Sequence, residues 1–238
     1  MDTLRRRLFG EPVVESWPFR FEWMWGVIRR SFVEDSGQPP QVIRRSQEAM
    51  MKLGAVRDVA RIPTTLRGVD AEWFRADSSV EAEPEPGSKA IVYLHGGGYF
   101  FGSTDSYADL LAEFAHRSDL PVLGVNYRRC PEHRIEDAVD DVVAVFEELY
   151  GRGWRAENLV VAGDSAGGGL AVSSCMAMRD RGVPVPAALG LISPWVDMRC
   201  EANSLEENSE TDYMTGEMLE EAVQINLRDR SPDDPMAS

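Results

Sequence analysis

Histidine is scarce in this sequence, and its distribution is uneven. The 238 residues contain three histidines, His95, His116 and His133, and none lies beyond position 133. The three cysteines form an odd set without Cys-x-x-Cys spacing, so neither a disulfide framework nor a zinc site is predicted. No apolar run reaches the roughly 18 residues that a bilayer-spanning helix needs. These shortages exclude a cysteine-based metal centre and a transmembrane span.

Positive charge is also in short supply, and lysine is almost absent. Lys52 and Lys89 are the lysines, and 25 cationic residues face 40 acidic ones, which gives a formal net charge of −15. Such a chain repels phosphate backbones and anionic lipid, so neither nucleic acid nor a membrane surface is expected as a partner. Glu11 and Pro12 interrupt the N-terminal segment before any apolar run, so we predict no signal peptide and a cytoplasmic location.

The remaining composition is that of a globular protein, with 43% hydrophobic and 27% charged residues, and one domain is expected. Residues 1–55 favour helices. Trp17, Phe21 and Trp25 share one helical face, although the aromatic residues in this stretch also alternate with the period of a strand. We favour a helix because Pro18 suits a first turn. A second helix is predicted over Gln41–Leu53.

Strands and helices alternate between residues 56 and 199. Strands are predicted at Val56–Ile62, Val69–Ala76, Ala90–Leu94, Pro121–Asn126, Leu159–Ala162 and Ala187–Ile192, and helices near Ser106–His116, at Ile135–Tyr150 and at Ala166–Asp180. This alternation predicts an α/β fold with a mostly parallel sheet flanked by helices. On the helix at Ile135–Tyr150, we interpret the Asp140-Asp141 pair as part of a solvated face. Residues 200–230 contain an acidic stretch and a further predicted helix, Thr215–Leu227.

The first motif that carries chemistry lies between a predicted strand and a predicted helix. It reads Gly163-Asp164-Ser165-Ala166-Gly167 and has the pattern G-x-S-x-G of a nucleophile elbow. A serine hydroxyl is a weak nucleophile, so it must project from a tight turn toward a base. The glycines on either side permit that turn, and the helix behind it directs free N–H groups at a developing oxyanion. Alone, the same pattern also fits a plain turn with Ser165 as a helix cap.

The second motif comes after the predicted strand Ala90–Leu94 and reads His95-Gly96-Gly97-Gly98. A His-Gly-Gly-Gly turn after the third core strand supplies oxyanion-binding N–H groups in lipases and esterases. Three glycines expose the backbone, so that amides rather than side chains face a substrate carbonyl. A flexible glycine loop with His95 as its cap is the alternative. The two motifs together, each after a strand, favour the serine hydrolase interpretation.

The segments YLHGGGYFFGS and VVAGDSAGGGLA resemble the hormone-sensitive-lipase-like carboxylesterases of the α/β-hydrolase superfamily. The segments Asn126–His133 and Ser193–Asp197 are similar to further motifs of that family. The resemblance implies an α/β-hydrolase core at residues 56–199, with a helical cap formed by residues 1–55 and 200–230. It implies a carboxylic ester hydrolase that acts on short- to medium-chain acyl esters and needs neither a metal nor an organic cofactor.

The resemblance also implies a role for each motif residue. Ser165 is the expected nucleophile, and Gly97, Gly98 and the N–H of Ala166 form the expected oxyanion hole. His95 orders the glycine loop and is not the base. The motif is supported by Gly96, Gly163, Asp164 and Gly167, with Asp164 in a structural rather than an acid–base role.

The sequence departs from the family on the C-terminal side of Ser165. In this superfamily the nucleophile precedes an Asp or Glu and then a His, yet no histidine lies beyond His133. Asp197 matches the motif after the sixth strand rather than the triad acid. We therefore expect a chain truncated before its last strands, with the catalytic Asp and His absent. The sixth strand is then expected as an exposed edge, open to pairing with a second copy.

Three hypotheses remain open on the sequence alone. One is an ester hydrolase that forms an acyl-enzyme on Ser165. Another is a non-catalytic relative that keeps the pocket and binds a small ligand without turnover. The last is an inactive gene fragment, since loss of triad members leaves only about 10³–10⁴-fold catalysis over water.

Overall fold

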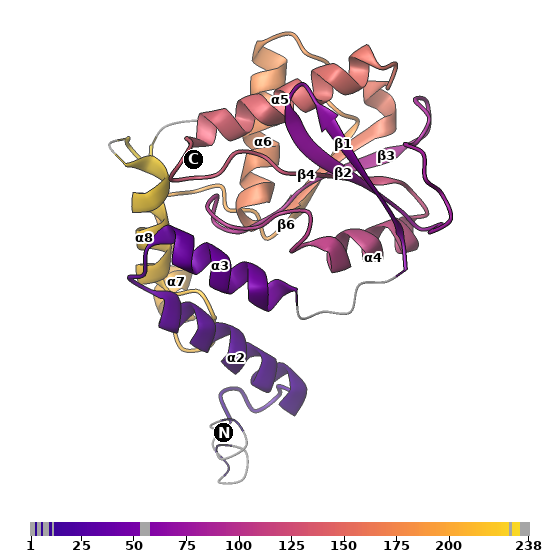
Figure 1. Ribbon diagram of the computed structural model, residues 1–238. Coiled ribbons are helices and arrows are strands. Elements are labelled where there is room, and N and C mark those ends of the chain that lie inside the picture. Colours follow the sequence, from indigo (N-terminus) through magenta and orange to yellow (C-terminus); the bar gives the residue numbers. More distant parts are fainter. Residues whose placement is uncertain are drawn as a thin grey trace.

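The computed structural model describes Thr3, Arg6, Gly10 and residues 12–52, 58–228 and 230–233. A six-stranded sheet lies at its centre, in the order β1-β2-β4-β3-β5-β6 (Figure 1). The strands are β1 (Ala60–Leu66), β2 (Val69–Arg75), β3 (Ala90–Leu94), β4 (Val122–Val125), β5 (Leu159–Asp164) and β6 (Ala188–Ile192). The pairings of β4 with β3, β3 with β5 and β5 with β6 are parallel, whereas β2 is antiparallel to both β1 and β4.

Helices cover both faces of the sheet. They are α2 (Phe19–Asp35), α3 (Pro40–Met51), α4 (Ala108–Ser118), α5 (Ile135–Gly151), α6 (Ser165–Asp180), α7 (Asn203–Glu207) and α8 (Gly216–Leu227), and a 3-10 turn spans Ala156–Asn158. Helices α5 and α6 pack together on one face, and α4 packs against β2 and β4 on the other (Figure 1). The mostly parallel α/β sheet predicted from the alternation of strands and helices is therefore confirmed.

The apolar stripe of α5 explains how this helix meets the sheet. Val139, Val142 and Phe146 are fully buried in the main hydrophobic cluster, as their spacing predicts. The interpretation of the Asp140-Asp141 pair as solvated is wrong for Asp141, which is 6% exposed. Its carboxylate accepts bonds from the backbone N–H of Arg128 at 2.8 Å and from Arg128 Nε at 2.9 Å, so a partner offsets its burial.

The N-terminal helices lie beside the C-terminal ones, at one end of the molecule (Figure 1). The N–H of Gly37 donates to Glu221 Oε1 of α8 at 2.9 Å, and Arg29 Nη1 of α2 donates to the carbonyl of Asp212 at 2.8 Å. The segment after Pro18 is helical, and the Trp17 ring lies 4.8 Å from the ring of Phe21. The Trp17 ring lies 5.7 Å from the ring of Trp25.

The first and last strands differ from the others in their surroundings. The strand predicted at Val56–Ile62 in fact begins at Ala60 and continues past Pro63 to Leu66; residues 56 and 57 lie outside the described ranges. Proline is tolerated there because β1 is an edge strand, with a neighbour on one side alone. Strand β6 forms the opposite edge of the described sheet, as predicted, and Leu189 and Ile192 are 44% and 47% exposed.

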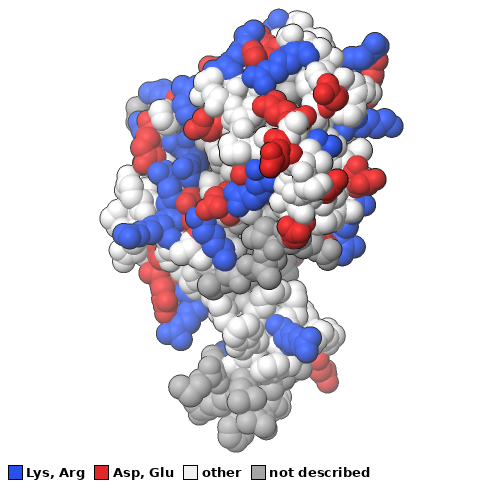
Figure 2. Space-filling view, turned by 45° about the vertical axis from the view of Figure 1, so that its right-hand side comes forward, with Lys and Arg blue, Asp and Glu red and all other residues white. Residues whose placement is uncertain are grey.

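Charges of both signs are interspersed over the face shown in Figure 2, without a broad basic patch there. Among the described residues, no helix combines the length and the apolar character required to cross a membrane.

Candidate active site

The two glycine-rich motifs meet because the strands that precede them are parallel neighbours. β3 ends at Leu94 and β5 ends at Asp164, and Leu94 is paired with Gly163 in the register. The glycine loop and the serine turn therefore leave the same edge of the sheet side by side. In open α/β sheets, ligands bind at this carboxyl edge.

Ser165 lies at a strained turn. It is the first residue of α6, it has a φ of +50°, and it is half-buried. A non-glycine residue in this left-handed region costs about 1–2 kcal/mol, so surrounding contacts must hold it there. One such contact is the bond from the N–H of Trp195 to the Ser165 carbonyl at 2.8 Å. A strained turn between a strand and a helix is also the geometry described for a nucleophile elbow.

The glycines of the elbow are needed for close packing. A Cβ on Gly167 would lie 2.1 Å from the Leu94 carbonyl oxygen and 2.5 Å from that of His95. A Cβ on Gly163 would lie 2.5 Å from the Gly167 carbonyl oxygen. Helix α6 therefore approaches the end of β3 more closely than any side chain permits, and this approach brings the serine turn against the glycine loop.

Bonds to the carbonyl groups of the glycine loop fix the direction of its amides. The Gly96 carbonyl is 2.8 Å from His95 Nδ1, and the Gly97 carbonyl accepts from the N–H groups of Phe100 and Phe101, both at 3.0 Å. In a planar trans peptide the N–H points opposite to the preceding carbonyl. The N–H groups of Gly97 and Gly98 are thus directed away from these partners.

His95 is buried beneath the loop and is neutral. Its ring stacks on Tyr127 with centroids 4.3 Å apart, and the Tyr127 hydroxyl donates to the His95 carbonyl at 2.6 Å. Burial lowers the pKa of His95 from 6.5 to about 4. Because Nδ1 faces the Gly96 carbonyl, the single proton belongs on Nδ1. The imidazole therefore serves the loop as a hydrogen-bond donor.

Asp164 joins the elbow to the glycine loop. Its carboxylate accepts from the Gly96 N–H at 3.0 Å, from the Tyr93 hydroxyl at 3.0 Å and from the Tyr107 hydroxyl at 2.8 Å. Burial and the nearby negative charge of Asp164 raise the pKa of both phenols well above their usual range, so both remain donors. With three donors bound, this carboxylate acts as a structural link.

The other two histidines lie away from the elbow. His116 is near the end of α4, where Nε2 is 3.1 Å from the Asp58 carbonyl, and α4 leads back to the opposite edge of the sheet. His133 is exposed in the segment after β4. Within the described ranges, neither an imidazole nor a carboxylate is bonded to the Ser165 hydroxyl. Asp197 is bonded to Arg199 at 2.9 Å, and this contact lowers the pKa of Asp197 to about 2.

Four side chains that contact the glycine loop or its flanks were missed by the sequence analysis. From α3, Arg44 Nε donates to the Phe100 carbonyl at 2.7 Å. The Glu48 carboxylate accepts from the Gly102 N–H at 3.0 Å and from Arg129 at 2.7 Å. The spacing of Arg44 and Glu48, four residues apart, could have placed both side chains on one face of α3. Asn226 of α8 donates to the Gly98 carbonyl at 2.8 Å, and no local pattern indicates this contact.

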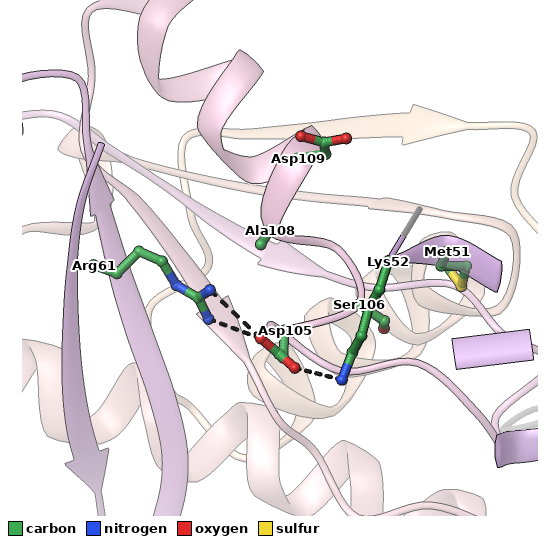
Figure 3. A pocket seen from close by; sticks show the side chains of 7 residues that line it. All are labelled: Met51, Lys52, Arg61, Asp105, Ser106, Ala108 and Asp109. Carbon is green, nitrogen blue, oxygen red and sulfur yellow. Dashed lines mark hydrogen bonds and ion pairs between the residues drawn. The ribbon is translucent and has the colours of Figure 1, made fainter. Parts of the chain in front are cut away.

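A separate pocket of about 170 Å³ lies between α3, β1 and the start of α4, and it is drawn in Figure 3. It is lined by Met51, Lys52, Arg61, Asp105, Ser106, Ala108 and Asp109. The Asp105 carboxylate is bonded to Lys52 at 2.5 Å and to Arg61 at 3.4 Å, and these cations lower its pKa. Lys52, Arg61 and Asp105 are therefore paired with one another, and the pocket contains none of the motif residues.

Across the described part of the chain, no group of three or more His, Cys, Asp and Glu side chains is arranged to hold a metal ion.

Known proteins share this sequence and this architecture. A family model described as alpha/beta hydrolase fold matches residues 91–238. An acetyl-hydrolase from Streptomyces hygroscopicus is 39% identical over 67% of this chain and 50% of its own length. An ethyl acetate hydrolase from Pseudomonas putida is 34% identical over 58% of this chain and 43% of its own length. This chain therefore spans half or less of these two curated relatives.

Solved structures agree with the sequence comparison. A mutant of the esterase E40 is superposed with a TM-score of 0.82 at 31% identity, covering 90% of this chain and 71% of that one. An esterase from the bacterial hormone-sensitive lipase family gives a TM-score of 0.78 at 30% identity, covering 90% and 72%. The chain belongs to the α/β-hydrolase-fold family and, within it, to the hormone-sensitive-lipase-like esterases.

Proposed function

We propose that this chain carries the nucleophile and the oxyanion hole of a carboxylic ester hydrolase. The observation that carries the proposal is Ser165 at φ +50°, at the start of α6, beside the glycine loop at the carboxyl edge of the sheet. The names of the esterase and acetyl-hydrolase relatives support the same reaction class.

The proposed reaction proceeds through an acyl-enzyme. Ser165 Oγ forms a bond to the acyl carbon of the ester while its proton passes to a base. The negative charge that develops on the carbonyl oxygen is stabilised by the N–H groups of Gly97, Gly98 and Ala166. Collapse expels the alcohol, which takes up the proton, and water then cleaves the acyl-enzyme to the acid and regenerates the serine.

The base is the part of this reaction that the described residues leave open. No histidine lies beyond Ser165 in the 238 residues, and His95 is committed to the Gly96 carbonyl. Without a bonded base the Ser165 hydroxyl is a weak nucleophile, so we propose that these 238 residues release esters through Ser165 far more slowly than a complete triad does.

Short- to medium-chain acyl esters are the proposed substrates. The printed names of two relatives, acetyl-hydrolase and ethyl acetate hydrolase, support small acyl groups. We also propose that residues 1–55 and 200–230 form a cap. The Phe32 ring of α2 lies 6.3 Å from that of Phe101 and 5.7 Å from that of Tyr213, so one ring of the N-terminal segment lies near both the loop and residues 200–230. The cytoplasmic location and self-association through β6 remain part of this proposal.

The test compares release of p-nitrophenol from acetate, butyrate and palmitate esters by the wild-type chain and by Ser165→Ala. Ser204→Ala, at the exposed start of α7, is the matched control. We expect Ser165→Ala to lower the rate to that of buffer on the two short esters, and Ser204→Ala to leave it unchanged. Equal rates for the wild-type chain and Ser165→Ala would show that Ser165 is not the nucleophile.

A second function is favoured by the absence of a bonded base at Ser165 among the described residues. A relative that keeps the pocket without turnover would bind a short ester or its acid reversibly. Calorimetric titration with butyrate distinguishes the two functions. Saturable binding together with equal ester release by the wild-type chain and Ser165→Ala would support a binding protein over a hydrolase.

A further inference from the structure

Asn226 is a buried polar residue in an unexpected place. It lies near the end of α8, with 5% of its surface exposed, and its Nδ2 is 2.8 Å from the Gly98 carbonyl, 128 positions away in the sequence. A carbonyl oxygen accepts hydrogen bonds and does not donate them, so the NH₂ group of the amide must face Gly98. The Oδ1 atom on the other side is buried without a partner in the described part of the chain. Burial of an unpaired oxygen costs stability, so the bond to Gly98 is the contact that offsets the burial of this amide.

The contact completes a series along the glycine loop. The carbonyls of Gly96 and Gly97 are held by His95 and by the N–H groups of the following turn, and the Gly98 carbonyl is held by Asn226. The Asn226 bond therefore orients the peptide that joins Gly98 to Tyr99. Both residues are in the left-handed region, with φ of +57° and +65°.

The left-handed conformation of Tyr99 needs support from outside the loop. A tyrosine at positive φ costs about 1–2 kcal/mol, so the loop relaxes unless other contacts hold it. The Tyr99 carbonyl accepts from the Cys130 N–H at 2.9 Å, and its buried ring lies 6.2 Å from that of Trp195. Asn226 fixes the other side of the same residue. Together these contacts fix the peptides on either side of Tyr99, next to the peptide that carries the Gly98 N–H.

Helix α8 is well placed to act as a support. Ala222 and Leu227 are buried in the main hydrophobic cluster, so the helix is fixed on either side of Asn226. Glu221 accepts from the Gly37 N–H at 2.9 Å, and this bond joins α8 to the segment between α2 and α3. Helix α8 therefore contacts both the N-terminal helices and the Gly98 peptide.

We propose that Asn226 is a positioning residue for the oxyanion hole, which fixes the Gly98–Tyr99 peptide and couples the loop to residues 200–230. The proposal rests on the proposed function for its catalytic meaning. Its geometric part, that the loop is held by Asn226, is testable without turnover.

The first measurement follows amide hydrogen exchange in the segment 96–102 for wild type, Asn226→Leu and Asn226→Asp. Leucine removes the donor at similar volume, whereas the carboxyl of N226D keeps the shape and donates only when protonated. Asn158→Leu is the matched control, because Asn158 also donates to a glycine carbonyl, that of Gly87 at 3.0 Å, on the exposed surface. We expect about tenfold faster exchange in N226L, with wild-type exchange in N158L. In N226D the excess over wild type should shrink as the pH falls.

The second measurement separates positioning from stability. On p-nitrophenyl acetate, N226L should lower the Ser165-dependent kcat at least about tenfold with KM within twofold, since a displaced amide weakens transition-state binding. Unchanged exchange at 96–102 in both Asn226 variants would overturn the proposal, as would faster exchange with kcat within twofold of wild type. If the wild-type chain shows no Ser165-dependent release, the proposed function fails, and the exchange result still decides whether Asn226 holds the loop.

Discussion

Gly167 lies directly against the carbonyl group of Leu94, so close that a Cβ on the glycine would be 2.1 Å from that oxygen. This contact joins the start of α6 to the end of β3 and thereby brings the serine turn and the glycine loop together. The Leu94 oxygen belongs to the backbone, so no change of side-chain rotamer can relieve the contact.

Gly167→Ala should consequently destabilise the fold by about 1–3 kcal/mol or more, because α6 must move away from β3. Gly151→Ala is the matched control, since a Cβ there meets nothing within 4 Å and the residue ends helix α5. Alanine should raise stability slightly at that position. Denaturant unfolding of both variants checks the prediction, and a loss below about 0.5 kcal/mol in G167A would contradict the close approach.

His95 should make the stability of the fold depend on pH in a defined window. Its pKa is lowered from 6.5 to about 4 by burial. As pH falls below 6.5, His95 binds a proton in the unfolded chain but stays neutral in the folded chain. The free energy of unfolding therefore decreases between about pH 6.5 and 4. The full loss is on the order of 3 kcal/mol. In His95→Gln this part of the slope should disappear, as measured by unfolding at intervals from pH 7 to 4. An unchanged slope would show that another group is responsible.

The Tyr107 hydroxyl should contribute to stability through Asp164. Tyr107→Phe leaves the half-buried carboxylate with two donors instead of three, and we expect a loss of about 1.5–3 kcal/mol, as for a hydrogen bond to a charged group. Tyr150→Phe is the matched control, because the Tyr150 hydroxyl donates to the Pro184 carbonyl at an exposed site. Its loss should stay below about 1 kcal/mol. Similar thermal shifts in the two variants would argue against a structural role for Asp164.

Arg44 should hold α3 to the glycine loop mainly through neutral acceptors. Its guanidinium bonds to the carbonyls of Phe100 and Cys130 and to both oxygens of Glu132. Lysine cannot reproduce this fork, so Arg44→Lys should cost about 1–3 kcal/mol.

The Glu132 ion pair is half-exposed, so Glu132→Gln should cost below about 1 kcal/mol. The bond to Arg44 lowers the pKa of Glu132 to about 2, so this smaller contribution is present above pH 4.5 and lost as pH falls toward 2. Chemical unfolding of both variants measures the difference. A larger loss of stability in E132Q than in R44K would show that the ion pair, rather than the bonds to the carbonyls, holds α3 to the loop.

The central strands were predictable because local patterns determine them. Ala90–Leu94 is an apolar run bounded by polar and glycine residues, and the strand has those bounds. The prediction ended the first strand at Ile62, whereas β1 continues through Pro63 to Leu66. Proline is compatible with an edge strand, and sheet order is a tertiary property that a local pattern does not show. The burial of Asp141 was missed for a similar reason, because it depends on Arg128, which belongs to another segment.

The motif residues of the site were predictable, whereas the side chains that support them were not. A strained turn and a glycine loop leave a signature within a few positions of the chain. Arg44 and Asn226 reach the loop from helices 56 and 128 positions away from the residues that they contact, and no local pattern encodes such a contact. These supports depend on how the N- and C-terminal helices dock, which the sequence of either helix alone does not determine.

The most direct test of Ser165 as the nucleophile is covalent trapping. The chain is mixed with p-nitrophenyl acetate, quenched with acid within the first turnover, digested and examined by mass spectrometry. We predict one acetyl group on the peptide that contains Ser165, absent from Ser165→Ala and unchanged in Ser204→Ala. Acetylation spread over other residues at the same rate, with the Ser165 peptide unmodified, would contradict the assignment of Ser165 as the nucleophile.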